Sequence, residues 1–304
     1  MTNFKKELEA RGKKPSITIS LFKQTYLKNI LITHTKGSFV QSKRSLEKFT
    51  NYLMDDLLLS DITKAQSESF ILGVYSRSKH TASLYLRNLK AAFNKAISWE
   101  HIEKNPFQGL KVVIEENYPV FIGVEELNRI VEKETNFMLA SIFRFAFYTG
   151  LRISEIVNLG WSDIDWENKI ISVKNKNDFI LKSKRQRDLP LSNVVYEILY
   201  NIRRDTGIVF HNNEERFRKE YVSKKFKKSV RSACLNDAIH FHTLRHSFAS
   251  NLASQGVNLF VIQKLLGHKD PSVTQKYSHL KNDDLVNAIN KLNLVYLKLY
   301  HIGK

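Results

Sequence analysis

The sequence predicts a mainly helical protein of two domains, with one small three-stranded antiparallel β-sheet in the second domain. Its 304 residues exceed the usual size of a single domain. Apolar side chains recur at helical spacing along most of the chain. Strand-like alternation with β-branched side chains occurs in one stretch, residues 161–192.

The charge of the chain indicates a polyanionic partner. The formal net charge is +18 and the pI is about 9.7, which favours nucleic acid over an anionic membrane. Residues 1–112 hold 19 Lys and Arg against 9 Asp and Glu, and residues 113–304 hold 29 against 21. Because both parts are basic, we expect DNA to be held from two sides.

Composition also limits the compartment and the chemistry. The chain has no run of eighteen apolar residues and no signal-peptide core near its start, so we expect a cytoplasmic, nucleoid-associated protein without a membrane partner. Cys234 is the single cysteine, which excludes an intramolecular disulfide and a Cys-based zinc site. We expect no metal and no cofactor.

The first domain is predicted at residues 15–106, behind a mobile basic arm at residues 1–14. Its apolar spacing indicates four or five helices in a small bundle. Residues suited to N-caps mark the helix starts: Ser38 or Ser42, Thr63 and Ser78. Basic side chains on the last of these helices are candidate phosphate contacts, which a solvated charged face would explain equally well: Lys79, Arg87, Lys90 and Lys95.

A linker is predicted at residues 107–118, after Asn105-Pro106, because this stretch has no helical period. The second domain, residues 119–304, opens with predicted helices at 124–132 and 138–148, the latter ended by Gly150. Arg152 should project from the elbow that follows.

The second domain continues with the predicted sheet and then with residues 192–237, which look helical. A dense basic patch in this part is a second set of candidate phosphate contacts, again with a solvated face as the alternative. It includes Lys224, Lys225, Lys227 and Lys228. An amphipathic helix at about 283–299 is expected to dock onto a neighbouring copy or onto its own domain.

Residues 240–280 concentrate polar groups that a structural helix pair would not need. His242 and Arg245 stand three apart on one predicted helix, so their side chains emerge on one face. A second helix at 259–266 should stop at Gly267, which places His268 in a sharp corner. Asp270 and Pro271 indicate the start of a third helix, with Tyr277 about two turns along it.

These residue types suggest phosphoryl chemistry without a metal. Guanidinium groups form bidentate bonds to phosphate, whereas Mg²⁺ would need several carboxylate ligands, and Asp270 is the only acidic residue of this stretch. A tyrosine can act as a covalent nucleophile when its proton is accepted nearby and cations neutralise the attacked phosphate.

The motifs HTLRH, LLGH and TQKYSH within residues 242–279, with TGLRISE at 149–155 and RDLPLS at 187–192, resemble the tyrosine recombinases of the phage integrase family, including Xer-like members. The resemblance covers the C-terminal two-thirds of the chain. It implies a helical core-binding domain and an α+β catalytic domain. It also implies that a homo-oligomer, a tetramer in the synapse, cuts and rejoins double-stranded DNA through a 3′-phosphotyrosyl intermediate, without metal or ATP.

The resemblance also implies a set of catalytic residues: Arg152, Lys182, His242, Arg245, His268 and Tyr277. The two arginines would clamp the phosphate, Lys182 would protonate the departing 5′-oxygen, His242 would exchange a proton with the tyrosine, and His268 would orient the site. Lys184 and then Lys176 remain alternatives to Lys182. An inactive DNA-binding protein of the same fold and a type IB topoisomerase remain alternative functions, and the sequence does not choose among integration, excision, inversion and dimer resolution.

Overall fold

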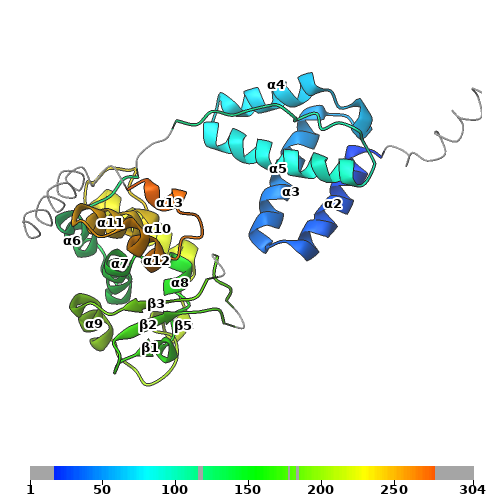
Figure 1. Cartoon of the computed structure of the whole chain (residues 1–304). Coiled ribbons are helices and arrows are strands. Elements are labelled where there is room, and N and C mark those ends of the chain that lie inside the picture. Colours follow the sequence, from blue (N-terminus) through cyan, green and yellow to red (C-terminus); the bar gives the residue numbers. More distant parts are fainter. Residues whose placement is uncertain (1–16, 116–118, 177–178, 183–184, 278–304) are drawn as a thin grey trace, which may run out of the picture. The chain divides into compact units, whose positions relative to one another are not determined.

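Figure 1 shows a computed structural model of the chain, which describes residues 17–115, 119–176, 179–182 and 185–277. The chain divides into two compact units, Met1–Glu116 and Asn117–Lys304. The predicted basic arm, the predicted C-terminal helix and Lys184 lie outside the described residues.

Helices make up most of the described part of the first unit: α2 (Ile19–Thr33), α3 (Lys36–Leu53), α4 (Lys64–Tyr75) and α5 (Lys79–Ser98). They surround an aromatic core in which Phe22, Phe49 and Phe93 are fully buried. Phe107, from the segment predicted as a linker, is also buried in this core, and its ring centroid lies 5.0 Å from that of Phe49.

The helix starts in this unit follow their capping residues. Thr63 and Gln66 form a reciprocal capping box at the start of α4, and the Ser78 hydroxyl accepts from the Thr81 amide at the start of α5, so both predicted starts are confirmed. The predicted start of α3 at Ser38 or Ser42 is wrong. Thr35 caps this helix, and the low helix propensity of Gly37 in its first turn hides the start in the sequence.

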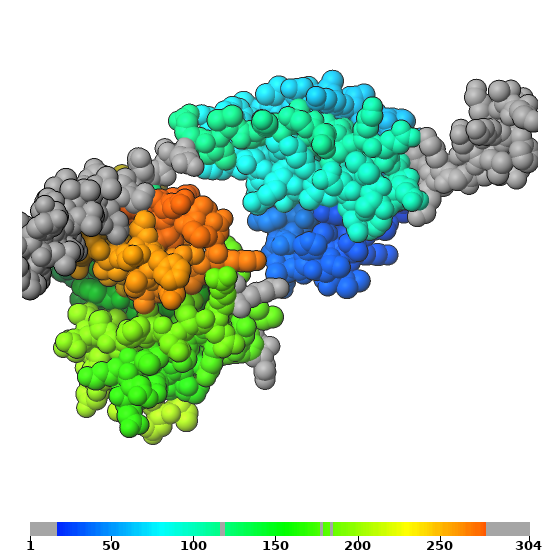
Figure 2. Space-filling model, viewed as in Figure 1, coloured from blue at the N-terminus to red at the C-terminus, as the bar shows by residue number. Residues whose placement is uncertain are grey.

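Helix α7 (Phe137–Thr149) lies at the centre of the second unit, where it contacts α6 (Val124–Glu132), α9 (Asn193–Tyr200), α10 (Lys219–Ser232) and α11 (Phe241–Ser254) (Figure 1). This position explains its apolar composition, because most of its side chains are buried. Three shorter helices complete the described part of the unit: α8 (Ile153–Ile156), α12 (Leu259–Leu266) and α13 (Ser272–Gln275). The last two lie at the surface of the unit, in orange in Figure 2.

The predicted three-stranded antiparallel sheet is confirmed, with strands β1 (Ile164–Asp165), β2 (Ile170–Val173) and β3 (Arg187–Pro190) in that order. Ile171 in the central strand pairs with Ile164 on one side and with Leu189 on the other. The connection from β2 to β3 carries Lys182.

The prediction of helix throughout residues 192–237 is wrong in its middle part. Strands β4 (His211–Asn212) and β5 (Glu215–Arg216) form a hairpin between α9 and α10. Asn213 and Glu214 connect them with φ of +49° and +69°, the positive values that a tight hairpin turn requires. Strands of two polar residues carry no alternation that sequence reasoning could detect.

None of the helices in the described residues is both long and apolar enough to cross a membrane.

Candidate active site

The elbow after α7 brings two arginines together. Helix α7 ends at Gly150, which adopts φ +63°, and the Gly150 carbonyl accepts a hydrogen bond of 2.7 Å from Nη1 of Arg245. A Cβ atom at Gly150 would lie 2.5 Å from the Phe248 ring and 2.9 Å from Leu266. The position therefore requires glycine for both its backbone conformation and its close packing.

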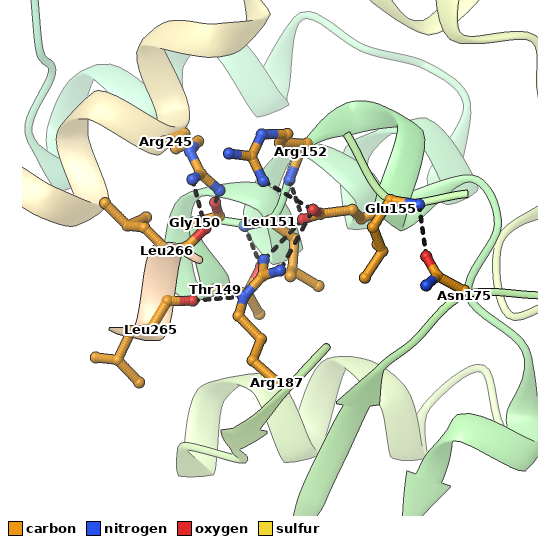
Figure 3. Close-up of polar contacts among 11 residues, drawn as sticks. Thr149, Gly150, Leu151, Arg152, Glu155, Asn175, Arg187, Arg245, Leu265 and Leu266 are labelled. Atoms are coloured by element: carbon orange, nitrogen blue, oxygen red, sulfur yellow. Dashed lines mark hydrogen bonds and ion pairs between the residues drawn. The ribbon is translucent and has the colours of Figure 1, made fainter. Parts of the chain in front are cut away.

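Glu155 holds two guanidinium groups beside this elbow (Figure 3). Arg152 precedes α8 and donates through Nη1 to Glu155 Oε1 at 2.9 Å, while Nη2 of Arg187 donates to Oε2 at 2.8 Å. Nε of Arg187 donates to the Leu265 carbonyl at 2.7 Å, which ties β3 to the end of α12. Burial of Glu155 would raise the pKa of its carboxyl, but the hydrogen bonds and charges of Arg187 and Arg152 outweigh it, so this pKa is lowered.

Arg245 is 2% exposed and is held by carbonyls rather than by a carboxylate. Its Nη2 donates to the Leu266 carbonyl at 2.6 Å, in addition to the bond to Gly150 (Figure 3). Burial, followed by the charge of Arg152, lowers the pKa of Arg245 to about 9, which leaves the group charged at neutral pH. Three guanidinium groups thus lie close to one carboxylate in this part of the structure. The excess positive charge suits a phosphate.

His268 lies in the corner predicted for it. Gly267 ends α12 with φ +64°, as the sequence predicts, and His268 follows with 9% of its surface exposed. Its Nδ1 lies 2.9 Å from the Thr274 hydroxyl. Burial, then the charges of Arg245 and Arg152, lower the pKa of His268 to about 3, so the ring is neutral at physiological pH.

His242 stands in the first turn of α11, and its ring meets that of His246 edge to face at 4.9 Å between centroids. The residue is exposed to solvent, although its ring contacts that of His246. Desolvation of that ring, followed by the charges of His246 and Arg245, lowers the pKa of His242 to about 3. Within the described residues, no group of three His, Cys, Asp or Glu side chains is arranged to hold a metal ion.

Tyr277 is 2% exposed and lies just after α13, which is shorter than the sequence predicts and contains four residues. Its hydroxyl lies 2.6 Å from Nδ1 of His246, a residue that we did not include among the candidates. The spacing offered a signal for it, because His246 is one helical turn beyond His242 on the same face. Burial raises the pKa of Tyr277 to about 12, against the opposing charge of Arg245.

The lysines of the β2–β3 connection have different surroundings. Lys176 bonds the buried Asp163 carboxylate at 2.5 Å and the Asn158 carbonyl at 2.7 Å, which gives it a structural role. Lys174 lies 3.7 Å from the same carboxylate. Lys182 is exposed, and within the described residues it makes no bond to the side chains of Arg152, His242, Arg245, His268 or Tyr277.

The candidate DNA contacts of the first unit differ in their partners. Lys90 donates to the Leu110 carbonyl, Lys79 pairs with Glu115 at 2.8 Å, and Lys95 lies over the Trp99 ring. Arg87 is exposed. Lys90 is thus held by a backbone carbonyl, whereas Lys79 and Arg87 are exposed and Lys95 is half-buried.

The candidate contacts of the second unit lie on α10. Lys227 pairs with Asp237 at 3.0 Å, and Lys225 lies over the Tyr221 ring. Lys224 and Lys228 are exposed. A groove lined in part by Lys224 and Lys227 extends to His242, so a basic surface adjoins the cluster of arginines and histidines.

The buried Glu155 carboxylate predicts an acid-dependent stability. Because its pKa is lowered in the folded state, its contribution is present above the unfolded value of about 4.3 and is lost as the pH falls through the folded value. We expect Glu155→Gln to cost about 3 kcal/mol at neutral pH, since Arg187 loses its charged partner. As the pH falls below about 5, the variant should lose less free energy of unfolding than the wild type. Urea unfolding at several pH values measures this difference, and identical acid dependence in both proteins would contradict it.

Known protein families match both units of the chain. The model of the phage integrase family matches residues 122–283, and that of the phage integrase SAM-like domain matches residues 18–114. A tyrosine recombinase of Thermosipho africanus is 29% identical over 272 residues, which cover 85% of this chain and 94% of the relative. The tyrosine recombinase XerC of Escherichia coli O127:H6 is 30% identical over 267 residues, covering 81% and 86%.

Solved structures show the same architecture. A lambda integrase tetramer bound to a Holliday junction matches with a TM-score of 0.71 and 20% identity, over 84% of this chain and 79% of that one. At this identity the likeness concerns the fold. Fold, sequence and relatives together define a DNA strand-exchange enzyme of the tyrosine recombinase class. The chain belongs to the phage integrase family, and the predicted family and two-domain architecture are confirmed.

Proposed function

We propose that this chain is a site-specific recombinase that cuts double-stranded DNA by forming a 3′-phosphotyrosyl bond at Tyr277, and that it needs neither metal nor ATP. The observation that carries the proposal is the cluster of Arg152, Arg187 and Arg245 around the single carboxylate of Glu155, next to the buried Tyr277. The net positive charge suits a phosphodiester that becomes more negative in the transition state.

Arg152 and Arg245 clamp the non-bridging oxygens of the scissile phosphate. Each guanidinium is held in place before DNA arrives, Arg152 by Glu155 and Arg245 by the carbonyls of Gly150 and Leu266. Such preorganisation means that little reorganisation is required when the charge develops. His268 hydrogen-bonds the phosphate from the corner after α12. His242, to which the resemblance assigns proton exchange with the tyrosine, stands in the first turn of α11.

The phenolic oxygen of Tyr277 attacks phosphorus, and the 5′-oxygen leaves with a proton from Lys182. The phosphodiester energy is retained in the phosphotyrosyl bond, so a 5′-hydroxyl from another duplex can attack it and complete the exchange. Two partners follow: double-stranded DNA, and other copies of this chain in a tetrameric synapse. The lambda integrase tetramer on a Holliday junction supports this assembly. We place the reaction in the cytoplasm, at the nucleoid.

The test is to map the covalent bond directly. Wild-type protein is incubated with duplexes that carry a nick just 3′ of the scissile phosphate. The short fragment that carries the new 5′-hydroxyl then diffuses away, and the intermediate accumulates. We expect a protein–DNA adduct that survives denaturation, and peptide mass spectrometry should find the nucleotide on Tyr277. An adduct on another residue, or none on any duplex offered from the flanking DNA of its gene, would refute the proposal. Relaxation of supercoils without a specific site would favour the topoisomerase alternative.

The role of Lys182 has its own test. Lys182→Ala should slow adduct formation by about 10²-fold or more, because the leaving 5′-oxygen loses its proton donor. A substrate with sulfur in the 5′-bridging position should restore the rate, since a thiolate leaves without a proton. Lys174→Ala is the matched control, because Lys174 lies in the same connection, is exposed and stands 3.7 Å from Asp163. If the 5′-sulfur substrate instead restores the rate of Lys184→Ala, Lys184 is the proton donor to the leaving oxygen.

A further inference from the structure

His246 contacts the reactive atom of the proposed nucleophile. It is the second histidine of the HTLRH motif, in the second turn of α11, and its Nδ1 lies 2.6 Å from the Tyr277 hydroxyl. Within the described residues, His268 bonds Thr274 and Arg245 bonds two carbonyls, so neither takes this position. Only His246, among these side chains, holds the hydroxyl.

The direction of this hydrogen bond follows from the protonation states. Burial raises the pKa of Tyr277 to about 12, so the phenol keeps its proton at neutral pH. Burial, followed by the charges of His240, Arg245 and Lys276, lowers the pKa of His246 to about 4, so its ring is neutral. The phenol therefore donates to Nδ1, and the ring proton resides on Nε2. The lone pair of Nδ1 already points at the proton that must leave.

We infer that His246, and not His242 as the resemblance implies, is the general base that accepts the Tyr277 proton when the phenolic oxygen attacks phosphorus. The P–O bond to Tyr277 forms, the P–O5′ bond breaks, the phenolic proton passes to Nδ1, and the 5′-oxygen receives a proton from Lys182. In the reverse step the 5′-hydroxyl attacks phosphorus and returns its proton to Lys182, the P–O bond to Tyr277 breaks, and the imidazolium gives its proton to the departing phenolate. This role presupposes the proposed function, because it needs Tyr277 as the nucleophile.

Bound DNA would make His246 a better base. In the part of the chain that the structure describes, the groups that face its ring are neutral or cationic: His240, His242 and Arg245 at the start of α11, and Lys276 and Tyr277 just after α13. Their positive charges oppose protonation in the free protein. A phosphodiester among them adds negative charge, which favours the imidazolium and moves its pKa towards the working pH, where a general base is most effective.

Two substitutions separate proton acceptance from simple positioning. His246→Asn keeps a hydrogen-bond acceptor close to the place of Nδ1 but cannot take up a proton, whereas His246→Phe keeps the ring shape and removes both functions. We expect both variants to form the adduct about 10²-fold or more slowly than wild type in single turnover. DNA affinity in a gel-shift assay and the thermal midpoint should stay close to wild type for the Asn variant. His34→Asn, at the end of α2 in the other unit, is the matched control.

A nucleophile that loses its proton easily should bypass the base. Replacing Tyr277 with a fluorinated tyrosine of lower phenol pKa should restore much of the rate of His246→Asn and change the wild-type rate far less. The 5′-sulfur substrate should rescue Lys182→Ala but leave His246→Asn slow, because the two protons move at opposite ends of the phosphorus. The rate should also rise with pH as a single base is deprotonated in wild type, and this limb should be absent in the Asn variant.

The outcomes distinguish this role from the proposed function itself. If wild type forms the adduct at Tyr277 while His246→Asn matches its rate, the base is another group and only the His246 assignment fails. Equal effects of fluorination in both proteins would also overturn it, and would leave His246 as a positioning residue. If wild type forms no adduct at Tyr277, the proposed function fails first.

Discussion

Tyr277→Phe should abolish the covalent protein–DNA adduct and leave DNA binding almost unchanged. The substitution removes one oxygen atom, the atom that we propose attacks phosphorus, and no other side chain can replace it at that position. The ring of Tyr277 remains buried, so we expect a stability cost of only about 1 kcal/mol from the lost hydrogen bond to His246. Denaturing gels with labelled, nicked duplexes measure the adduct, and gel shifts measure binding.

The control for this experiment is a tyrosine elsewhere in the same unit. Tyr221→Phe removes the hydroxyl of an exposed residue on α10 whose ring contacts Phe217 and Lys225, and it should cleave at the wild-type rate. Adduct formation by Tyr277→Phe at any measurable fraction of the wild-type rate would assign the nucleophile to a different residue.

Gly150→Ala should be the most destabilising single-methyl change in the site. A residue with a side chain is strained by about 1 kcal/mol at φ +63°, and its Cβ would lie 2.5 Å from the Phe248 ring. Forcing the ring aside adds about 1 to 3 kcal/mol. We expect a total loss of about 2 to 4 kcal/mol, together with slower cleavage, because the Gly150 carbonyl also holds Arg245.

Gly207→Ala separates the backbone strain at positive φ from the clash with Phe248. Gly207 also has positive φ, at +91°, but a Cβ there would meet no atom within 4 Å. Hydrogen exchange in α7 and α11, measured during urea titration, reports the local stability of each variant. The loss should be clearly larger at Gly150, since only that position adds a clash. Equal losses of stability in the two variants would show that the Phe248 ring moves aside without an energetic cost.

Local signals in the sequence predicted much of the fold. Thr63 and Ser78 start their helices, and Gly150 and Gly267 end theirs, because each of these choices depends on a few neighbouring residues. The β4–β5 hairpin was missed because its strands are too short to show a period and its turn contains Asn213 and Glu214 rather than glycine.

The contacts that assemble the site were harder to predict. Spacing showed that His242 and Arg245 share a helix face, but it could not show that His246 would meet Tyr277, 31 residues further along. The bond between Arg187 and Glu155 spans 32 residues and joins a strand to a helix, so no local pattern contains it. Sequence spacing gives the direction of a side chain, whereas its partner depends on how the elements pack.

Arg245 fastens the ends of two helices with one planar group. Its two terminal nitrogens reach the carbonyls of Gly150, after α7, and Leu266, in the last turn of α12. An ammonium group presents a single nitrogen and cannot span both acceptors in the same geometry. The residue that we expect to bind the substrate phosphate therefore also connects two helices. A substitution that changes the chemistry at this position would need a second change that holds the ends of α7 and α12 together.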